Sequence, residues 1–432
     1  MDAKTIREKH KQFLFPNVAN YYAESLVLDH AKGMQVFDKE GKQFLDFFGG
    51  ILTVSVGHCN DHVVKKTHEQ AQQLGHTSTL YPTENIVTMA ERLANLAPKH
   101  DKGWKTFFTS SGTEADETAV LLARVHTGAS EVIALRHSYS GRSALAINLM
   151  GNMNYRVVPS SIPGIKHAHA PYCYRCDLGL EYPSCGLKCA KDIEVLIQTE
   201  TSGRPSAFLA ETVLGVGGFI VPPIEYFKEA VDIVRKYGGL FICDEVQAGF
   251  GRTGKHMFGI QHYGVTPDII SMAKGIANGA PVGATIAKAE IADSFKAASI
   301  ATYGGNPVSM AAALATLDVI EESKLLENSE KIGNHLRAGM EALKTDFPVI
   351  GDVRGMGLMQ AMELVKDRKT KEPDAPSANR FMEETKKPGL LVGKGGLYGN
   401  VIRVAPPMIA TKGDVDDALK AMREAYSAMA KA

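Results

Sequence analysis

The chain has 432 residues, of which 44% are hydrophobic and 22% are charged, a composition typical of folded globular domains. Its 48 Lys and Arg residues equal its 48 Asp and Glu residues, so the net charge is zero. A zero balance argues against a nucleic-acid-binding protein and against a polybasic membrane anchor. This length predicts two or three domains.

The N-terminal segment MDAKTIREKHKQFLFPN contains no apolar run, which argues against a secretory signal, and Asp2 and Glu8 disfavour a mitochondrial transit peptide. The longest uncharged stretch lies between Lys296 and Asp318. Residues 304–307 (GGNP) interrupt it, so a membrane-spanning helix is not expected there. The sequence therefore predicts a cytoplasmic protein that does not bind membranes.

Alternating polar and apolar residues at 34–48 predict a hairpin near the N-terminus. Through the centre of the chain, short apolar strands alternate with amphipathic helices. The expected elements are strand 105–110, helix 113–127, strand 131–136, strand 207–211, helix 223–237 with Pro223 in its first turn, strand 238–245 and strand 267–273. Further along, the expected elements are long helices at 326–346 and 412–430 and strands near 356–364 and 400–405.

Apolar strands separated by helices predict a mostly parallel sheet that is buried on both faces. This α/β part of the chain is expected to form a large domain, residues 61–320. The flanking segments, residues 1–60 and 321–432, are expected to combine into a smaller α+β domain.

The segment 244–254, DEVQAGFGRTG, matches two nucleotide-binding patterns that lack their required context. Gly249, Gly251 and Gly254 fit the dinucleotide fingerprint, but DEVQ separates them from the preceding strand and no helix is expected to follow. The same glycines begin a P-loop-like pattern in which His256 replaces the Ser or Thr that binds magnesium. A nicotinamide-dependent oxidoreductase is therefore only a remote alternative.

Two charged residues each lie at the end of an apolar strand, where ligands bind in open α/β sheets. Asp244 is either a salt-bridged or capping residue or the counter-ion of a buried cation, because an unpaired carboxylate is costly to bury. Lys274, taken alone, is interpreted as a solvated lysine at a strand end. Together they fit a pyridoxal phosphate enzyme, which needs a Lys to form a Schiff base and an Asp to keep the pyridine nitrogen protonated.

Pyridoxal phosphate also needs a phosphate cradle, and residues 110–113 (SSGT) lie between an expected strand and an expected helix. Backbone N–H groups at the start of a helix, together with hydroxyl groups, suit a dianionic phosphate. The same residue types are also favoured as a plain helix cap.

These residues belong to longer segments that resemble class III aminotransferases, the pyridoxal-phosphate-dependent family that includes ornithine, 4-aminobutyrate and alanine–glyoxylate aminotransferases. The matching segments are FLDFFGGILTVSVGHC (44–59), TSSGTEADETA (109–119), ICDEVQAGFGRTG (242–254), PDIISMAKGIANGAPVGA (267–284), TYGGNP (302–307) and VRGMGLMQAMEL (353–364). The resemblance implies an aspartate-aminotransferase-like fold. Its large domain would bind the cofactor and would contain a mostly parallel sheet of the seven-stranded type, sandwiched by helices.

The resemblance also implies a role for each matching residue. Lys274 would form the Schiff base and then carry the proton between the substrate Cα and the cofactor C4′. Asp244 would pair with the pyridinium nitrogen, Gln247 would hydrogen-bond the phenolic O3′, and Tyr139 matches the aromatic residue that stacks on the pyridine ring. The cofactor phosphate would be held by Ser111, Gly112 and Thr113.

Further matches concern the partner subunit and the substrate. Thr302 matches a Thr that reaches the phosphate from the partner subunit, which implies an obligate homodimer, and Tyr81 is expected near the dimer interface. Arg403 matches the Arg that binds the substrate α-carboxylate through a guanidinium–carboxylate fork; the alternative is a surface salt bridge. Glu211 matches the Glu that pairs with this Arg and releases it for a carboxylate.

The sequence departs from the family pattern in three places. Residues 139–142 read Tyr-Ser-Gly-Arg where an aromatic residue and His-Gly-Arg are usual. Thr212 stands where Pro usually follows the Glu, and Leu214 stands where Gln is often found. The first difference concerns a polar contact beside the cofactor, and the other two concern the acceptor preference.

Four cysteines form the pattern C-x2-C-x8-C-x3-C, which resembles a zinc-binding loop: Cys173, Cys176, Cys185 and Cys189. Structural zinc and two disulfides are both open, whereas reduced thiols are expected in a cytosolic enzyme. Similar insertions occur in relatives of the alanine–glyoxylate and ω-amino acid–pyruvate types, which favours that branch.

The sequence thus predicts a transaminase that moves an amino group from an amino acid or ω-amino donor to a 2-oxo acid by a ping-pong mechanism. Pyruvate and glyoxylate are the favoured acceptors, and a homodimer or a dimer of dimers is expected. A pyridoxal phosphate lyase, racemase or aminomutase on the same fold is the alternative. The donor is left open, because it depends on pocket side chains expected near Tyr22, Leu52 and Tyr81.

Overall fold

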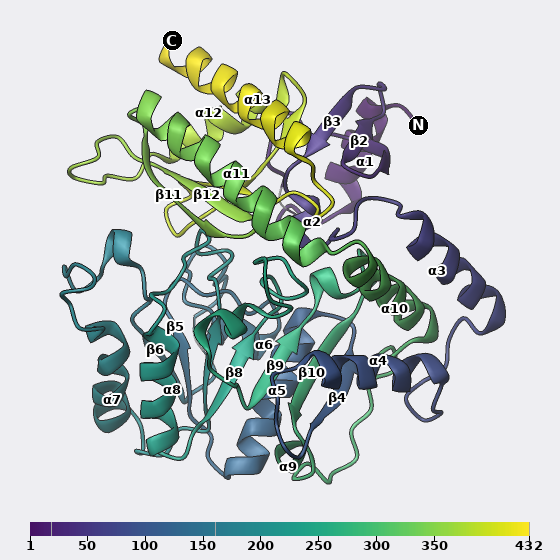
Figure 1. Ribbon diagram of the computed structural model, residues 1–432, viewed down its shortest axis with the longest axis vertical. Coiled ribbons are helices and arrows are strands. Elements are labelled where there is room, and N and C mark those ends of the chain that lie inside the picture. Colours follow the sequence, from purple (N-terminus) through teal and green to yellow (C-terminus); the bar gives the residue numbers. More distant parts are fainter. Residues whose placement is uncertain (19, 160, 432) are drawn as a thin grey trace.

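The computed structural model describes residues 1–18, 20–159 and 161–431. A large region is built around a central sheet, and a smaller region holds both ends of the chain (Figure 1). The N- and C-termini therefore lie in the same part of the molecule, above the central sheet in this view.

The central sheet contains seven strands in the described part of the chain. Strands β6, β5, β7, β8 and β9 run parallel to one another, and β10 runs antiparallel to both β9 and β4. In sheet order the strands are β4 (Trp104–Thr109), β10 (Gly283–Lys288), β9 (Ile269–Met272), β8 (Leu240–Asp244), β7 (Ala207–Glu211), β5 (Val132–Leu135) and β6 (Ile165–Ala168). The expected mostly parallel sheet is confirmed.

Helices cover both faces of this sheet, which explains why its central strands are apolar throughout. On β7, Ala207 and Leu209 join one core cluster with residues of helices α5, α6 and α9, while Phe208 and Ala210 join another with residues of α7, α8 and α10. The helices of the large region are α3 (Asp61–Gln73), α4 (Glu84–Leu96), α5 (Gly112–Thr127), α6 (Ala144–Leu149), α7 (Lys188–Glu200), α8 (Tyr226–Lys236), α9 (Ala289–Ala292) and α10 (Pro307–Glu322). Short 3-10 helices are η1 (Cys173–Arg175), η2 (Gly259–Tyr263) and η3 (Lys274–Ile276).

The smaller region combines segments from both ends of the chain. Strand β13 pairs in parallel with β3, with Leu390 opposite Leu45, so an N-terminal hairpin and a C-terminal strand share one sheet. That sheet contains β1 (Leu28–Lys32), β2 (Gln35–Asp38), β3 (Gln43–Asp46) and β13 (Leu390–Leu391). A second sheet contains β11 (Ile350–Met356), β12 (Met359–Leu364), β15 (Val401–Val404) and β14 (Gly393–Gly395). The expected α+β unit is present.

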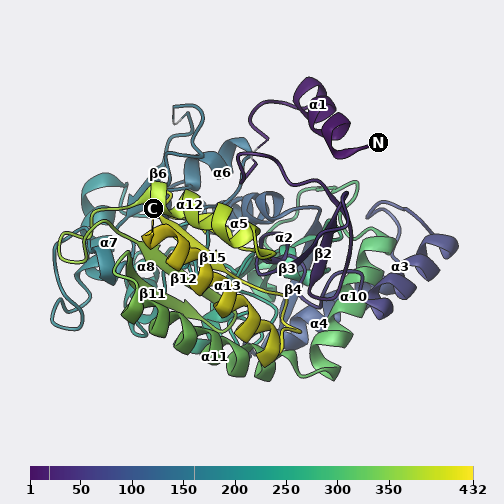
Figure 2. The same ribbon diagram turned by 90° about the horizontal axis from the view of Figure 1, so that it is seen from above.

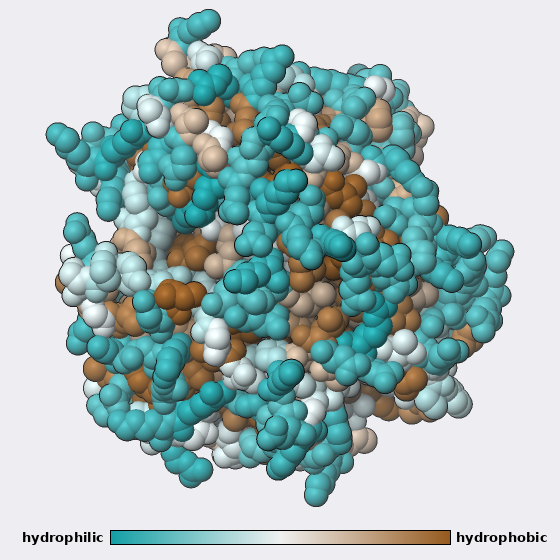
Figure 3. All heavy atoms as spheres, in the orientation of Figure 1, coloured by the Kyte–Doolittle hydropathy of each residue, from teal (hydrophilic) through white to brown (hydrophobic). Residues whose placement is uncertain are grey.

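Helices from both ends complete this region: α1 (Ala3–Phe13), α2 (Gly49–Leu52), α11 (Leu325–Asp346), α12 (Ala375–Lys386) and α13 (Lys412–Ala430). Helix α1 lies at the edge of the molecule in Figure 2, and Ala3 is its one buried side chain among the described residues. On the face shown in Figure 3, hydrophilic side chains cover most of the surface and hydrophobic ones are visible between them.

Two sequence predictions differ from the structure. The strand expected at 356–364 is the end of β11, a turn at Gly357 with φ of 53°, and β12. Pro223 was expected in the first turn of a helix, but α8 begins at Tyr226. Residues 224–225 form a turn that precedes the helix, in which Tyr226 N donates to Pro223 O at 3.0 Å. None of the described helices is long and apolar enough to cross a membrane.

Candidate active site

A cavity of about 190 Å³ lies at the carboxyl edge of the central sheet. This position follows from topology, since the carboxyl ends of parallel strands meet at one edge, and the loops that follow them supply the lining. Predicted site residues that the structure brings together here are Gly112, Thr113, Tyr139, Glu211, Asp244, Gln247 and Lys274. The other lining residues are Asp116, Ser140, Gly141, Arg142 and Val246.

Asp244 is the last residue of β8 and is buried, and its Oδ1 accepts a hydrogen bond from Val246 N at 2.8 Å. Burial raises the pKa of Asp244 to about 6, although Val246 N–H and Lys274 oppose the shift. Lys274 follows β9 and has a φ of 45°, a conformation that costs a non-glycine residue roughly 1–3 kcal/mol. Burial lowers the pKa of Lys274, while Asp244 and Glu211 raise it.

The lining contains more buried carboxyl groups than the sequence predicted. Burial and the charge of Asp244 raise the pKa of Glu211 to about 8, and the same causes raise the pKa of Asp116 well above its ordinary value. Asp116 was not predicted as a site residue. It lies four residues after Gly112 on α5, so the i, i+4 spacing on one helix face is the signal that identifies it.

The predicted phosphate cradle lies at the N-terminus of α5. Ser111 is the N-cap, and its Oγ donates to Glu114 Oε2 at 2.9 Å and accepts from Glu114 N at 3.4 Å, so its hydroxyl is engaged within the helix end. Gly112 and Thr113 face the cavity. A Cβ on Gly112 would lie 3.0 Å from Val246 Cγ1, so glycine keeps this first turn open.

Two polar atoms of the lining are buried without a hydrogen-bond partner: Gln247 Oε1 and Ser140 Oγ. Buried polar groups are normally paired, so these atoms point to a polar ligand. Tyr139 lies in the same lining, and its ring packs edge-on against Tyr155 with centroids 5.3 Å apart. The replacement of the usual His by Ser140 thus leaves an unpaired hydroxyl beside the expected ring position.

Arg403 lies on β15 and is buried, above the rings of Phe48 and Phe219 at 4.9 and 5.6 Å. Its Nε and Nη2 donate to Lys394 O at 3.1 and 2.9 Å. The surface salt bridge considered as its alternative is excluded by this burial. Tyr21, whose ring centroid lies 5.9 Å from that of Phe48, approaches this wall of the site.

The expected Glu211–Arg403 ion pair is not formed between these described residues. Glu211 accepts from Tyr139 N at 2.9 Å and from Gly215 N at 2.8 Å, while Arg403 Nη1 donates to Gly215 O at 3.4 Å. The backbone of Gly215 therefore stands between the two side chains and bonds both.

Ser111 and Arg403 are not among the residues that line the cavity, and the structure places four further predicted residues outside it. Thr302 lines a separate groove of about 580 Å³ that also contains Ser110, and Tyr81 is 67% exposed. Tyr22 lies under Lys386, with Nζ 4.6 Å from its ring centroid, and Leu52 is buried in a core cluster with Phe48.

The four clustered cysteines border one small hollow of about 20 Å³. All four are unpaired, and burial raises the pKa of Cys189 to about 11, which favours a neutral thiol. Within the described residues, no group of His, Cys, Asp or Glu side chains is arranged to hold a metal ion. Neither the zinc interpretation nor the disulfide interpretation gains support.

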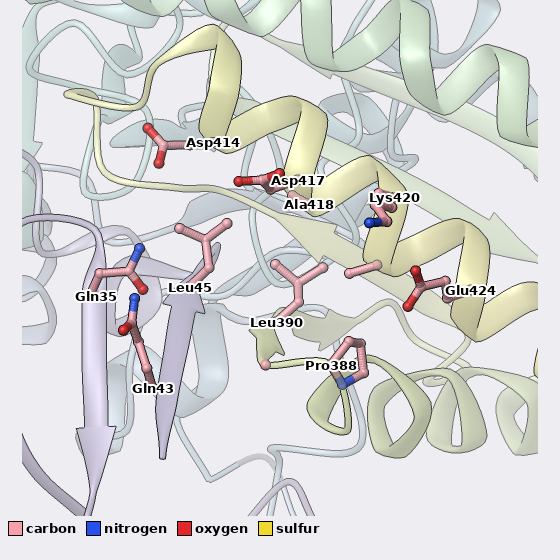
Figure 4. Close-up of a pocket in the computed structure, with 12 residues that line it drawn as sticks. Gln35, Gln43, Leu45, Pro388, Leu390, Asp414, Asp417, Ala418, Lys420 and Glu424 are labelled. Carbon is pink, nitrogen blue, oxygen red and sulfur yellow. The ribbon is translucent and has the colours of Figure 1, made fainter. Parts of the chain in front are cut away.

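A further hollow of about 420 Å³ lies between β2, β3, β13 and α13. Figure 4 shows the carboxylates of Asp414, Asp417 and Glu424 along α13, facing Gln35 and Gln43 from the strands. No predicted site residue lines it, so the cavity at the sheet edge is the candidate active site.

Comparisons with known proteins agree with this site. The family model named "Aminotransferase class-III" matches residues 18–426. A protein of Arabidopsis thaliana named alanine–glyoxylate aminotransferase 2 homolog 2, mitochondrial, is 41% identical over 430 residues, covering 99% of this chain and 88% of that protein. A leucine/methionine racemase of Thermococcus litoralis is 36% identical over 431 residues, covering 99% of this chain and 96% of that protein.

Solved structures of transaminases also superpose on this chain. A Bacillus anthracis aminotransferase superposes with a TM-score of 0.92 at 30% identity, covering 99% of this chain and 100% of that one. A pyridoxal-phosphate-bound amine transaminase from an uncultivated Pseudomonas species has a TM-score of 0.89 at 30% identity, covering 96% of this chain and 98% of that one.

The fold and the lysine–aspartate cavity define a pyridoxal phosphate enzyme of the α/β transaminase architecture. The chain belongs to the class III aminotransferase family. The cavity fits the cofactor of that family, because it offers a lysine amine, buried carboxyl groups that need a cationic partner, unpaired polar atoms and an open helix N-terminus. Neither the family model nor the relatives and structures named above support the nicotinamide alternative.

Proposed function

We propose that this aminotransferase transfers the amino group of alanine, or of a related ω-amino acid, to glyoxylate or pyruvate. The observation that carries the proposal is the 41% identity, over 99% of the chain, to a relative named for alanine and glyoxylate. The buried Arg403 supports it, because both substrates carry a carboxylate that a guanidinium group can bind.

Lys274 and Asp244 are proposed to carry the chemistry. When bound, pyridoxal phosphate supplies an electron-withdrawing ring that stabilises negative charge at the substrate Cα. Lys274 would attach the cofactor covalently, and its lowered pKa favours the neutral form of the released amine, which could then move the proton from the substrate Cα to C4′ of the cofactor. Asp244 would hold the ring nitrogen as its charge partner.

The remaining lining residues are proposed to orient the cofactor. Gln247 would donate to O3′ of the cofactor, and Tyr139 would stack on the ring. The α5 N-terminus would hold the phosphate through Ser111, Gly112 and Thr113, because its free N–H groups and the helix dipole favour an anion.

Arg403 is proposed to bind the substrate carboxylate and Glu211 to control it. A bound carboxylate would compete with the carbonyl oxygens that Arg403 now contacts. The Gly215 peptide would couple the two side chains, because it bonds Glu211 through its N–H and Arg403 through its carbonyl.

A homodimer with shared sites is proposed from the position of Thr302. It lies in an open groove outside its own chain's cavity, beside Ser110 at the phosphate end of that site. Exposed apolar side chains on the same groove, Ile300 and Tyr303 at 61% and 66%, favour a second copy as the occupant. Whether two dimers associate further stays a prediction.

We also propose a cytoplasmic location. All cysteines in the described residues are unpaired, as in a reducing compartment. The Arabidopsis relative is named as mitochondrial, so fractionation of the source cells is the test. Recovery in the cytosolic fraction is expected, and enrichment with an organelle would contradict the proposal.

The second candidate activity is racemisation, favoured by the 36% identity to a leucine/methionine racemase. Both activities require a lysine that moves a proton at Cα, but only a transaminase retains the amino group on the cofactor. Incubation with L-alanine alone separates them by absorbance and chiral analysis. Bleaching of the visible band with release of pyruvate is expected, whereas formation of D-alanine with an unchanged band would favour the racemase.

Substrate identity is tested by a panel of amino donors against pyruvate, glyoxylate and 2-oxoglutarate. We expect the highest kcat/KM with alanine or an ω-amino acid as donor and with glyoxylate or pyruvate as acceptor. A clear preference for 2-oxoglutarate would contradict the proposed acceptor.

A further inference from the structure

The candidate active site contains an excess of buried acidic side chains. Asp116, Glu211 and Asp244 are 1%, 4% and 3% exposed, and all three line the cavity. The lining residues that the structure describes include two cations, Lys274 and Arg142, and Arg142 is exposed. Three ionised carboxylates facing one buried amine would leave uncompensated charge in a small cavity, so at least one of them carries a proton.

The hydrogen bonds identify the protonated carboxyl group. Glu211 accepts from two backbone N–H groups and Asp244 accepts from one, and these bonds favour the ionised forms, although burial still raises the pKa of Glu211 to about 8. Among the described residues, Asp116 accepts no backbone N–H, and the one hydrogen bond that it accepts comes from Ser271 Oγ, 2.5 Å from its Oδ1; this bond also favours the ionised form but is outweighed by burial. A neutral carboxylic acid can also accept that bond through one oxygen while it donates through the other.

The helix position of Asp116 does not reverse this assignment. Asp116 lies in the second turn of α5, where the helix dipole favours a negative charge only weakly and the effect falls off beyond the first turn. The penalty for burying an unpaired carboxylate is much larger than this contribution. The proton is therefore placed on Asp116.

We propose that Asp116 is a protonated positioning residue: its carboxylic acid, fixed by Ser271, donates a hydrogen bond to Asp244 and keeps Asp244 ionised and directed at the cofactor ring nitrogen. This inference rests on the proposed role of Asp244. Asp116 lies on α5, Ser271 on β9 and Asp244 on β8, three neighbouring elements in Figure 1, so the helix and two strands hold the arrangement together.

The electrostatics of the cluster agree with this geometry. Burial and the charge of Asp244 raise the pKa of Asp116 well above its ordinary value, with Glu211 acting in the same direction; the Ser271 hydrogen bond and Lys274 lower it and are outweighed. A side-chain hydrogen bond from Asp116 lowers the pKa of Asp244, against the larger effect of burial. A neutral Asp116 thus helps its neighbour keep its charge, whereas an ionised Asp116 would repel it.

The direct test is infrared spectroscopy of the cofactor-loaded enzyme at about pH 9, where an ordinary Asp, with a pKa of about 3.9, is ionised. The pKa of Glu211 is about 8, so Glu211 is mostly ionised there too. We expect the carbonyl band of a protonated carboxylic acid in the wild type and in the matched control Glu211→Gln, and its loss in Asp116→Asn. Absence of the band from the wild type, or its survival in Asp116→Asn, would overturn the proposal.

A second test compares the acid limb of the kcat/KM profile and the pH titration of the visible cofactor band in two variants. Asp116→Asn keeps a neutral donor, so both curves should stay in place. Asp116→Ala removes the donor, so both should move to higher pH by about one unit. Movement of the Asp116→Asn curves to lower pH would show that an ionised Asp116 had been replaced, and this would contradict the proposal.

The two tests separate this inference from the proposed function. The infrared band reports the proton on Asp116 whatever reaction the enzyme performs. Covalent labelling of Lys274 reports the cofactor bond whatever the protonation of Asp116. If Lys274 is labelled but the infrared band of Asp116 is missing, the positioning role of Asp116 is rejected and the proposed role of Lys274 stands.

Discussion

Asp244 is a buried carboxyl group at the end of a strand, and burial raises its pKa to about 6. A ring nitrogen that carries a proton would supply the positive charge that such a carboxylate otherwise lacks. The proposed role therefore explains why an acidic residue is kept at a position where it is costly.

Replacing Asp244 by Asn removes this charge and retains the shape of the side chain. We expect kcat to fall by about 10³-fold, the scale of losing one preorganised electrostatic partner, with the cofactor still bound. Steady-state kinetics with alanine and pyruvate measure the effect, and Asp232→Asn, at an exposed pair with Lys228, is the control. A variant within tenfold of the wild type would contradict the assignment.

Arg403→Ala should weaken substrates that carry a carboxylate by about 10- to 100-fold in kcat/KM, the scale of a lost charge-assisted hydrogen bond. Amine donors without a carboxylate should be affected much less. Arg403→Lys serves as the matched control, because it keeps the charge and loses the planar fork. Equal losses for amines and amino acids would show that Arg403 does not bind the carboxylate.

Among single site residues, the sequence predicted those at or just after strand ends and missed those that only tertiary contacts define. Asp244, Gln247 and Lys274 are readable because strand ends converge at one sheet edge. Asp116 was missed because its inward direction depends on the rotation of α5. The Glu211–Arg403 pairing was expected from the resemblance, but the backbone of Gly215 occupies both partners, which no side-chain pattern reveals.

Among the elements, β12 carries a heavily bonded buried acid, Glu363, which is 1% exposed. It accepts hydrogen bonds from Tyr172 and Arg175, beside the cysteine cluster, and from Arg354 on β11 at 2.8 Å. Arg354 Nε donates to Gly218 O at 2.9 Å, on the loop that follows Glu211. The network thus links the small region to a loop of the active site.

Glu363→Gln should destabilise the protein by about 3 kcal/mol, because Arg175 loses its carboxylate partner while Arg354 keeps, among the described residues, only Asp352. Thermal or denaturant unfolding measures this loss. Glu225→Gln is the control, since Glu225 is exposed beside Tyr182 and should change stability by less than about 0.5 kcal/mol. A Glu363→Gln variant as stable as the control would show that the network does not hold the regions together.

The contacts of Glu363 with Arg354 and Tyr172 also predict that the stability of the protein depends on pH. Burial alone would raise the pKa of Glu363, but Arg354 and the Tyr172 hydrogen bond outweigh it and hold the pKa below its usual value. The contribution of Glu363 is therefore present above the unfolded pKa of about 4.3 and is lost as pH falls through the folded pKa. The stability gap between wild type and Glu363→Gln should narrow on acidification.

Element boundaries were predictable where the apolar pattern was strong. Helix α13 and strand β7 begin and end where the sequence predicted. Strand β6 was missed because three of its four residues are only half-buried, so its sequence lacks a continuous apolar run. Strand β10 and helix α10 lie in the Gly-, Ala- and Ser-rich part of the chain. Apolar residues there show neither the spacing of a helix nor the alternation of a strand clearly.

The whole molecule joins both ends of the chain in one small region. The parallel pairing of β3 with β13 connects Leu45 and Leu390, a separation that local periodicity does not encode. The pattern of elements predicted a smaller domain built from both ends of the chain, but it did not predict which of their strands pair. The boundaries at residues 60/61 and 320/321 stay a prediction.

Shared active sites predict that two defective chains restore each other. A Lys274→Ala chain and a Thr302→Ala chain, mixed by co-expression, form a heterodimer in which one site receives Lys274 from one subunit and Thr302 from the other. Activity should exceed the sum of the two separate variants. A chain that carries both substitutions, mixed with either single variant, is the control and should restore nothing. Simple additivity in the first mixture would contradict a site built from two subunits.

The central claim is that Lys274 binds pyridoxal phosphate covalently, and borohydride reduction followed by peptide mapping tests it most directly. Reduction should fix one cofactor per chain on the peptide that contains Lys274, and Lys274→Ala should take up none on any lysine. Cofactor fixed on a different lysine, or absent from every peptide of an enzyme that shows the visible band, would contradict the account.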